Sequence, residues 1–435
     1  MILSYSKFRQ SIVYLSVACL VTWIVPNYYS HFSETLALVN SGKQILYTFW
    51  YGISFLIFGE MVGIYARKSN RFTVRSLFIF LLASFLAGLS LIIIVWILEY
   101  DFVGRLAILK IASGTGVLCF LFFSLQNWYS RKNKVNCLLC LSRNSKKIIQ
   151  NELKRIESSY VLLEWEEKNS KLSINEFCAK NNVDLLVLES QNGSGHLDVV
   201  PLLEAGIRIM NLKDFSEKNL EKIPPAFVNR SWLLGLDLRM RDPLLHKIKR
   251  IMDITVGSFG LLFSLPILIP SLLVIALNSG FPVFFSQTRT GFLGREYVLY
   301  KLRTMKKDAE NDGAVWANKK DSRITHVGKF LRKWRIDEIP QFWNIIIGDM
   351  SIVGPRPERP EFQEQLKKDV PHWNCRHLVK PGLTGWAQIQ FEYASDLKSS
   401  EEKLAYDLYY IKHASIIFDI QIILSTLRSI AKGSR

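Results

Sequence analysis

The chain has 435 residues, of which 49% are hydrophobic, and carries a formal net charge of +17 at pH 7. It is too long for one ordinary domain, and its basic residues cluster beside apolar runs. This arrangement favours anionic lipid headgroups and phosphorylated substrates and argues against a nucleic-acid partner. The six cysteines include Cys137 and Cys140, but no second pair follows to complete a zinc site, so all six are predicted to be reduced core residues.

Apolar segments of membrane-spanning length occupy the first part of the chain, at about 10–28, 45–65, 76–98 and 103–126. The positive charges around them are unevenly placed. Lys7 and Arg9 precede the first segment, Arg67, Lys68, Arg71 and Arg75 follow the second, and Arg131, Lys132 and Lys134 follow the fourth. The other connections carry little positive charge, so the positive-inside rule places both ends of the bundle in the cytoplasm. Residues 1–131 are therefore predicted to form a four-helix transmembrane domain.

Residues 132–240 change to short apolar strands that alternate with polar helical stretches, and strands are expected at VNCLLCL, SYVLLEW, VDLLVLES and IRIMNL. The alternation predicts a small cytosolic parallel α/β domain of Rossmann-like type. A dinucleotide site needs glycines directly after the first strand, but 142–147 contain none, which disfavours nucleotide binding. A regulatory role and homo-oligomerisation stay open for this domain. Pro224-Pro225 and 239–243 are interpreted as the linker to the last domain.

The last domain, 241–435, begins with a fifth apolar run from Ile254 to Leu277, which as a straight helix would extend roughly 36 Å and could cross a bilayer. Basic residues lie on both sides of the run, with Lys247, Lys249 and Arg250 before it and Arg289, Arg295, Lys301 and Arg303 after it. Both ends therefore favour the cytoplasm, and Pro266 and Pro270 force a bend between them. We predict a membrane helix near 251–278 that turns back within one leaflet, with Lys249, Arg250 and Pro266 at the membrane and its lipid phosphates. A kinked transmembrane helix is the alternative.

An adjacent carboxylate pair, Asp337 and Glu338, lies in a basic setting further along this domain. Asp337 is predicted to be a helix N-cap, with Pro340 in the first turn and Gly348 ending the helix. A carboxylate there lies among free N–H groups at the positive end of the helix dipole. It is expected to stay ionised and to face a docked anion, either as a nucleophile or as a metal ligand. Taken alone, such a pair is more often only a cap.

An arginine locked between two prolines follows, Arg356 between Pro355 and Pro357. The fixed backbone presents its guanidinium group to an oxyanion with little flexibility to lose. The residues predicted to contact diphosphate and lipid phosphate are Arg289, Lys301, Arg303, Arg335 and Arg356. Their alternative role is a solvated basic face near anionic lipid. A site rich in arginine suits phosphoryl transfer, which depends on positioning and charge neutralisation more than on acid–base catalysis.

Several ordered motifs in this region resemble the core signature of the bacterial sugar transferase family, the polyprenyl glycosylphosphotransferases. They are KRIMD from Lys249 to Asp253, PVFFSQTRTGFLGREYVLYKLRTM from Pro282 to Met305, LRKWRIDEIPQFWNIIIGDMSIVGPRPE from Leu331 to Glu358, KPGLTGWAQI from Lys380 to Ile389, and YDLYYIKHASIIFDI from Tyr406 to Ile420. The resemblance covers about Lys249 to the C-terminus. It implies a re-entrant helix with its break at Pro266, and a catalytic α/β domain preceded in larger members by an accessory domain like 132–240.

The resemblance also implies a reaction. A sugar-1-phosphate would pass from a nucleotide diphosphate sugar, above all a UDP-sugar, to polyprenyl (undecaprenyl) phosphate, and surface or exopolysaccharide assembly would begin there. Asp337 would attack the phosphorus that bears the sugar and form a covalent intermediate, with Mg²⁺ held by Asp337 and Glu338 and with Glu338 orienting metal or nucleophile. The expected location is the bacterial cytoplasmic membrane, with the catalytic domain in the cytoplasm.

Three alternatives to this mechanism and function stay open at this point. The first is direct in-line transfer without a covalent intermediate. The second is a sugar transferase that acts at the anomeric carbon, although the DxD-type metal motif usual for such enzymes is missing from the catalytic region. The third is a non-catalytic membrane scaffold of polysaccharide assembly, which the intact Asp337-Glu338 pair argues against.

Overall fold

The computed structural model describes residues 5–28, 43–65, 74–99, 105–132, 134–142, 145–147, 149–150, 153, 160–163, 165, 174–189, 198–228, 232–233, 242–306, 309, 321, 323–391 and 397–431. Many residues used above for the topology prediction, among them Arg67, Lys68 and Arg71, lie outside these ranges. The chain divides into two compact units, essentially Leu3–Leu220 and Glu221–Arg435. Each is described by itself.

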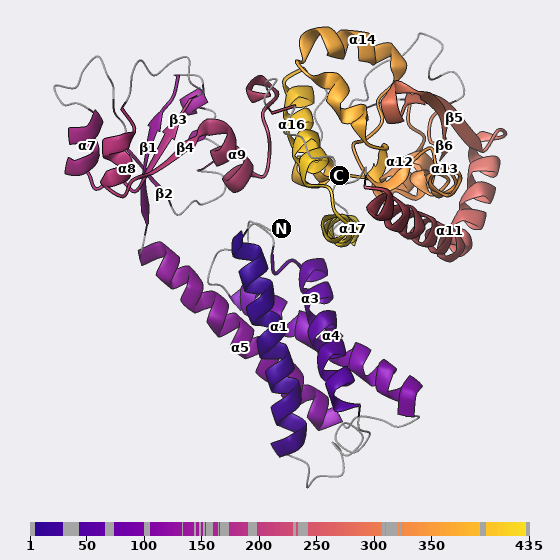
Figure 1. Ribbon diagram of the computed structural model, residues 1–435. Helices are drawn as coiled ribbons and strands as arrows, with labels where there is room; N and C mark the ends of the chain where they lie inside the picture. The colour runs from indigo at the N-terminus through magenta and orange to yellow at the C-terminus, as the bar shows by residue number, and fades with distance from the viewer. Residues whose placement is uncertain are drawn as a thin grey trace. The chain divides into compact units, whose positions relative to one another are not determined.

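The first unit begins with four long helices, labelled in Figure 1: α1 (Tyr5–Tyr28), α3 (Gln44–Val62), α4 (Val74–Glu99) and α5 (Arg105–Lys132). Their positions confirm the four predicted N-terminal helices. Three of them are long and apolar enough to cross a membrane, whereas α1 has a shorter apolar stretch, Gln10–Val25. Buried hydroxyls tie three helices together, since Tyr51 and Ser84 share a hydrogen bond of 2.7 Å and Ser84 Oγ donates to Ala112 O at 2.7 Å. These bonds satisfy polar groups that the apolar bundle buries.

The α/β part of this unit contains a parallel sheet with the order β2-β1-β3-β4. Its strands are β1 (Val135–Cys140), β2 (Tyr160–Leu163), β3 (Leu185–Leu188) and β4 (Arg208–Asn211), with helices α7 (Ile174–Lys180), α8 (Val200–Glu204) and α9 (Leu212–Leu220). The predicted parallel α/β fold is confirmed. After β1, the backbone N–H of Ser142 and the hydroxyl of Ser145 both donate to Glu189, each at 2.5 Å. An internal carboxylate therefore takes donors that a nucleotide phosphate would use in a dinucleotide fold.

The second unit is a mixed α/β domain. Its elements are η3 (Pro225–Phe227), α11 (Pro243–Ser279), β5 (Phe284–Thr290), η5 (Phe292–Gly294), β6 (Glu296–Leu302), α12 (His326–Lys333), η6 (Ile336–Glu338), α13 (Gln341–Ile347), β7 (Ser351–Val353), α14 (Pro360–Asp369), η7 (Trp373–Leu378), β8 (Gly382–Thr384), α15 (Trp386–Gln390), α16 (Leu397–His413) and α17 (Ile416–Ala431). Strands β5 and β6 form an antiparallel hairpin, and β7 pairs with β8 in parallel. The main core packs β7, α15, α16 and α17 around buried side chains such as Trp373, Trp386 and Phe418.

The stretch around Pro224-Pro225, interpreted above as part of a linker, belongs to this core, whereas residues 239–241 lie outside the described ranges. Ile223, Val228 and Trp232 are buried in it, and the backbone N–H of Ile223 donates to Ala405 O at 2.9 Å. The second unit therefore begins at Glu221, ahead of the domain boundary predicted at residue 240. Pro224-Pro225 suggested a connection because proline usually marks one, but its neighbours carry apolar side chains that fill the core.

Truncation at the two boundaries is expected to give proteins of different stability. A chain of residues 241–435 lacks Ile223, Val228 and Trp232, and burial of each such side chain contributes about 1.5–3 kcal/mol. Its midpoint of thermal unfolding in detergent should lie roughly 10 °C or more below that of 221–435. A chain of residues 229–435 keeps Trp232 alone and should melt in between. Equal midpoints for all three would show that the segment is only a linker.

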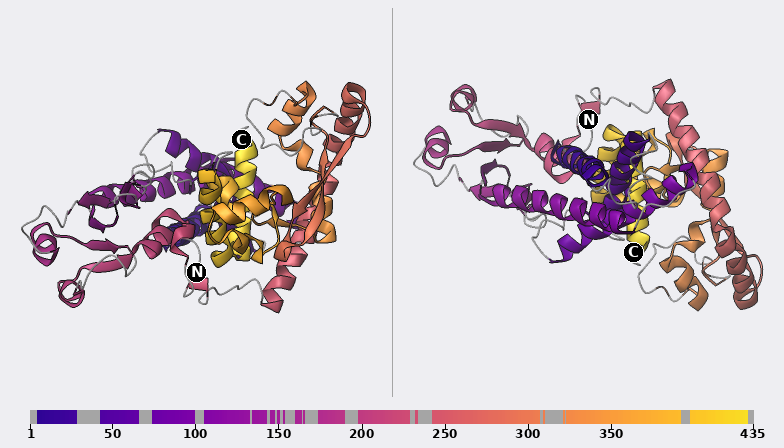
Figure 2. Two further views of the ribbon diagram at one scale, coloured as in Figure 1. Left: turned by 90° about the horizontal axis from the view of Figure 1, so that it is seen from above. Right: turned by 90° about the horizontal axis from the view of Figure 1, so that it is seen from below.

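Helix α11 contains the fifth apolar run. It spans 37 residues with Pro266 and Pro270 inside it. Figure 1 shows the helix as two arms that meet at a bend, and Figure 2 shows it from two further directions. Ser264 Oγ donates to Leu261 O at 2.9 Å and Ser271 Oγ to Ile267 O at 2.7 Å, so hydroxyls bind carbonyls close to both prolines.

The surface of α11 is unusually apolar for a helix in contact with water. Phe263 is 74% exposed and Leu277 is 79% exposed, and α11 is one of four described helices that are long and apolar enough to cross a membrane. A continuous exposed surface of this kind marks an interface with lipid or another protein. The basic residues on either side of the helix favour lipid.

Candidate active site

The acidic pair lies in a short turn between α12 and α13. Arg335 adopts a left-handed conformation with φ 56°, and Asp337 and Glu338 then belong to the 3₁₀ turn η6. Helix α13 starts at Gln341 with Pro340 at its N-cap position, and Gly348 ends it with φ 105°. The end at Gly348 is confirmed, but the prediction that Asp337 is the N-cap is wrong. The chain already reverses at Arg335, so Asp337 has no extended backbone from which to cap a helix.

Glu338 is the centre of an ion-pair cluster. Its Oε1 atom lies 2.7 Å from Arg356 Nη2 and 3.8 Å from Lys301 Nζ, and its Oε2 atom lies 3.4 Å from Arg335 Nη1. The carboxylate is 8% exposed. Four of the predicted site residues, which come from β6, η6 and the turn after β7, are thereby brought together beside Asp337.

The charges in this cluster control one another. Burial alone would raise the pKa of Glu338, but Arg356, Lys301 and Arg335 outweigh it and hold that pKa well below its ordinary value. Burial lowers the pKa of Lys301 to about 8, against the opposing effect of Glu338. Glu338 is therefore an anion throughout the physiological range, and a buried carboxylate of this kind orients the cations around it.

Asp337 differs from its neighbour. It is 7% exposed, and the part of the chain that the structure describes contains no ion pair to it. Burial and the charge of Glu338 raise its pKa, while Lys301, Arg332 and Arg356 act in the opposite direction. The expectation that a helix N-terminus keeps Asp337 fully ionised is thus wrong, because burial and Glu338 raise its pKa more than the surrounding cations lower it. Asp337 is the carboxylate that stays available to a ligand.

The same difference decides how a metal ion would fit. The described residues contain no cluster of three or more histidine, cysteine or acidic side chains. Mg²⁺ does not need one, because it commonly takes one or two carboxylates together with substrate phosphates and water. Both oxygens of Glu338 already face cations, so Asp337 suits the role of metal ligand better than Glu338 does.

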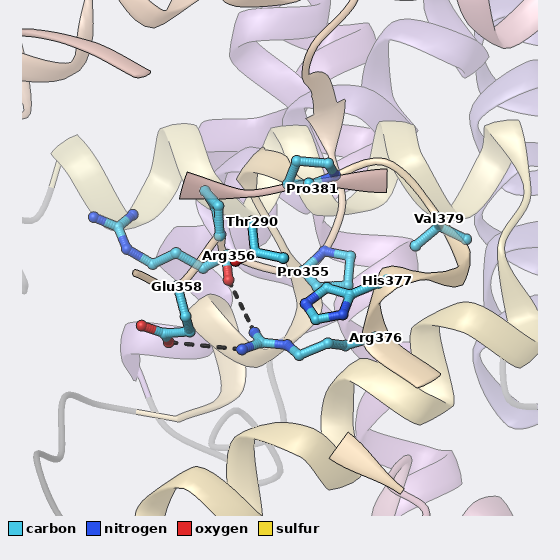
Figure 3. A pocket seen from close by; sticks show the side chains of 10 residues that line it. Thr290, Pro355, Arg356, Glu358, Arg376, His377, Val379 and Pro381 are labelled. Carbon is cyan, nitrogen blue, oxygen red and sulfur yellow. Dashed lines mark hydrogen bonds and ion pairs between the residues drawn. The ribbon is translucent and has the colours of Figure 1, made fainter. Parts of the chain in front are cut away.

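The proline-locked arginine lies in a turn bounded by a small cavity. Its volume is about 10 Å³, and Thr290, Glu358, Arg376 and His377 are among its walls (Figure 3). A larger cavity of about 450 Å³ shares Thr290 and His377 with it. Burial lowers the pKa of His377 to about 4, so its imidazole is neutral at pH 7.

Arg289 and Arg303 have protein partners. Arg289 donates to Pro357 O at 3.2 Å and to Gln287 Oε1 at 2.6 Å, so it holds the turn that carries Arg356. Arg303 donates to the carbonyls of Ser279 and Gly280 at the end of α11. Neither has a described ion pair with Asp337 or Glu338.

Lys249 and Arg250 connect α11 to the rest of the domain. Lys249 lies 2.7 Å from Asp419 and 3.6 Å from Asp253, and Arg250 donates to the carbonyls of Ile345 and Ile346 at the end of α13. Asp253 accepts hydrogen bonds from Ser351 Oγ and from the Ile352 N–H, both at 3.0 Å and both in β7. The KRIMD motif therefore attaches α11 to the strand that leads into the Arg356 turn. Pro266 lies well inside α11.

Three further residues were not singled out from the sequence. Asn344 of α13 is fully buried and binds the backbone of two β6 residues. It accepts from the Tyr300 N–H and donates to Val298 O. Arg376 and Asp407 form a buried ion pair of 2.9 Å behind the Arg356 turn. A polar residue inside an apolar run was the available signal for Asn344 and Asp407, whereas no sequence signal distinguished Arg376.

Comparisons with known proteins agree with these motifs. The sequence model of the family described as "Bacterial sugar transferase" matches residues 244–433. A UDP-N-acetylgalactosamine-undecaprenyl-phosphate N-acetylgalactosaminephosphotransferase of Aeromonas hydrophila is 38% identical over 229 residues, 53% of this chain and 53% of that protein. A UDP-glucose:undecaprenyl-phosphate glucose-1-phosphate transferase of Escherichia coli is 43% identical over 183 residues, 41% of this chain and 39% of that protein.

A shorter relative is covered more fully. The UDP-glucose:undecaprenyl-phosphate glucose-1-phosphate transferase of Caulobacter vibrioides is 34% identical over 184 residues, which are 42% of this chain and 69% of that protein. The matches to the first two relatives span about half of their length or less.

Proposed function

Because this chain belongs to the bacterial sugar transferase family, we propose that it moves a sugar-1-phosphate from a nucleotide diphosphate sugar to undecaprenyl phosphate and releases a nucleoside monophosphate. A UDP-sugar is the proposed donor, because the relatives described above are named for UDP-sugars. The lipid-linked product would begin the assembly of a surface polysaccharide. The observation that carries the proposal is a buried acidic pair in which Glu338 holds Lys301, Arg335 and Arg356 while Asp337 stays available.

The proposed chemistry has two steps. In the first, an Asp337 carboxylate oxygen attacks the phosphorus that bears the sugar, the phosphoanhydride bond breaks, and its electron pair leaves with the nucleoside monophosphate. In the second, an oxygen of undecaprenyl phosphate attacks the same phosphorus and the bond to Asp337 breaks, which restores the carboxylate. Neither step needs a general base once Asp337 is ionised, because both nucleophiles are then anions.

The cations of the cluster support both steps. Arg356 is 40% exposed at its side chain, so its guanidinium group is accessible to phosphate oxygens beside Glu338. Lys301 supplies a second positive charge, and Glu338 fixes both. A Mg²⁺ ion held by Asp337 would supply further neutralisation of the diphosphate.

Direct in-line transfer from donor to lipid is the competing mechanism. It would need both substrates bound at once, with Asp337 serving only as a metal ligand. The absence of a described ion pair at Asp337 favours the covalent route, because a nucleophile must reach the phosphorus without first breaking a salt bridge.

The function is tested by offering the purified full-length protein a panel of UDP-sugars with undecaprenyl phosphate and measuring nucleoside monophosphate. We expect release with one or a few sugars and formation of a lipid-linked sugar phosphate. If the lipid acceptor is never modified with any nucleotide sugar, the proposal is wrong and the scaffold function takes its place.

We also propose a location, the bacterial cytoplasmic membrane, with the second unit in the cytoplasm and α11 re-entering one leaflet. Basic residues before and after α11 support this, as does the bend between its two arms (Figure 1). The bend would bring both ends of an apolar helix back to one surface.

Tags placed before Lys247 and after Met305 are therefore expected to lie on the same, cytoplasmic side. Accessibility to a membrane-impermeant reagent, before and after permeabilisation, measures this. A tag beside Glu34, between the first two predicted spans, is the control and should be labelled from outside. Opposite accessibility of the first two tags would mean that α11 crosses the membrane.

A further inference from the structure

The turn that carries Arg356 is held at consecutive carbonyl groups. Pro355 O accepts from the Gly382 N–H at 2.9 Å, Arg356 O accepts from Arg376 Nη2 at 2.9 Å, and Pro357 O accepts from Arg289 Nη1 at 3.2 Å. The two prolines have no N–H to donate, so the peptide orientations in this turn depend on what binds the carbonyls.

Arg376 is the donor to the carbonyl oxygen of Arg356 itself. Its side chain is 3% exposed, and the same Nη2 atom lies 2.9 Å from Asp407 of α16, which is 2% exposed. The guanidinium group lies over the Trp373 ring, with its central carbon 4.3 Å from the ring centroid, and its Nη1 atom lies 3.7 Å from Glu358. A buried arginine is costly unless it is paired in this way, and its fixed fork leaves little freedom to move.

The two sides of Arg356 face different partners. Figure 3 shows its side chain extending away from Arg376 while its carbonyl oxygen is bound by Arg376. The end of that side chain contacts Glu338 at 2.7 Å. A shift of the carbonyl would therefore rotate the peptide and displace the guanidinium group at the acidic pair.

We propose that Arg376, held by Asp407, is a positioning residue that fixes the main chain of Arg356 and so aims its guanidinium group at the phosphate site. Arg376 acts only through Arg356 and does not itself touch substrate. The inference rests on the proposed function, because its main test measures transferase activity at the Asp337–Glu338 site.

The first test replaces Arg376 by lysine in the full-length protein. Lysine keeps the positive charge beside Asp407 but lacks the planar fork that reaches Arg356 O as well. We expect kcat/KM to fall roughly tenfold to a hundredfold, the size associated with misplacing a catalytic group by about 1 Å. Asp407→Asn keeps the size of the side chain and should give a smaller loss, which serves if the lysine variant does not fold.

The matched control breaks another buried ion pair of helix α16. Lys222 Nζ lies 2.7 Å from Glu402 Oε1, with the lysine side chain 3% exposed. Lys222→Met should lower the unfolding temperature and leave kcat/KM unchanged. An equal loss of activity in both variants would assign Arg376 a purely structural role and overturn the proposal.

A double-mutant cycle gives the decisive result. In an Arg356→Ala background there is no guanidinium group left to aim, so Arg376→Lys should change single-turnover rates and UDP affinity by less than roughly twofold. Independent effects that multiply in the double variant would refute the proposal. Lack of turnover in the wild-type protein would instead count against the proposed function, and the cycle would then be read from UDP binding alone.

Discussion

Replacement of Asp337 by asparagine is expected to remove essentially all turnover. An uncharged amide can neither attack phosphorus nor restore a carboxylate in the second step, and it is a poor ligand for Mg²⁺. Initial rates of nucleoside monophosphate release measure the loss, which should exceed roughly ten-thousandfold for a residue that forms the covalent bond. Asp349→Asn removes a carboxylate at the other end of α13, where it accepts a weak bond of 3.5 Å from Asn344, and should stay within a few-fold of wild type.

The covalent route also predicts a half reaction. Wild-type protein given the nucleotide sugar without lipid acceptor should release about one equivalent of nucleoside monophosphate and gain the mass of a sugar phosphate at Asp337. The Asn variant should show neither. Strict dependence of release on the lipid acceptor, with no adduct in the mass spectrum, would reassign Asp337 as a metal ligand in direct in-line transfer.

Replacement of Arg356 by alanine is expected to lower kcat/KM by roughly a hundredfold to a thousandfold. One cause is the loss of a donor aimed at transferring phosphate. A second is electrostatic, because Arg356 is the strongest of the cations that lower the pKa of Glu338 against the effect of burial. Without it that pKa rises, so on acidification the activity of the variant should begin to fall at a higher pH than that of the wild-type protein.

A pH profile of kcat/KM separates these two causes. An unchanged acidic limb would show that Lys301 and Arg335 suffice to keep Glu338 ionised. Arg295→Ala, which removes an exposed arginine from the turn after η5, is the control and should leave both rate and profile unchanged.

Sequence patterns predicted the fold where local signals suffice. The four N-terminal helices and all four parallel strands were found within a few residues of their positions, because long and short apolar runs are visible in the local composition. The start of the second unit at Glu221 was not predicted, because it depends on contacts far along the chain: Ile223 donates to Ala405 O of α16, and Glu221 O accepts from Trp386 of α15. No local pattern distinguishes such a segment from a linker.

The candidate site was predictable in its residue types and less so in its geometry. Charged motifs in the sequence singled out Lys301, Arg335 and Arg356, and the structure brings all three to Glu338. The left-handed conformation of Arg335, directly before the 3₁₀ turn that contains Asp337, could not be predicted because no glycine marks the position. Arg303 was predicted to contact phosphate because the sequence shows its charge. The sequence does not show that Arg303 binds the carbonyl of Ser279 at the end of α11.

The attachment of α11 through Asp253 and Lys249 limits how this protein could be simplified. In many membrane-bound proteins the anchor is a separable appendage, and its deletion yields a soluble, active fragment. Here α11, which exposes large apolar side chains, also supplies the carboxylate that binds Ser351 and Ile352 of β7, the strand immediately before the Arg356 turn. Helix α11 is thus an integral part of the domain that carries the candidate site. A water-soluble version requires polar substitutions on the exposed apolar surface of α11 rather than removal of the helix.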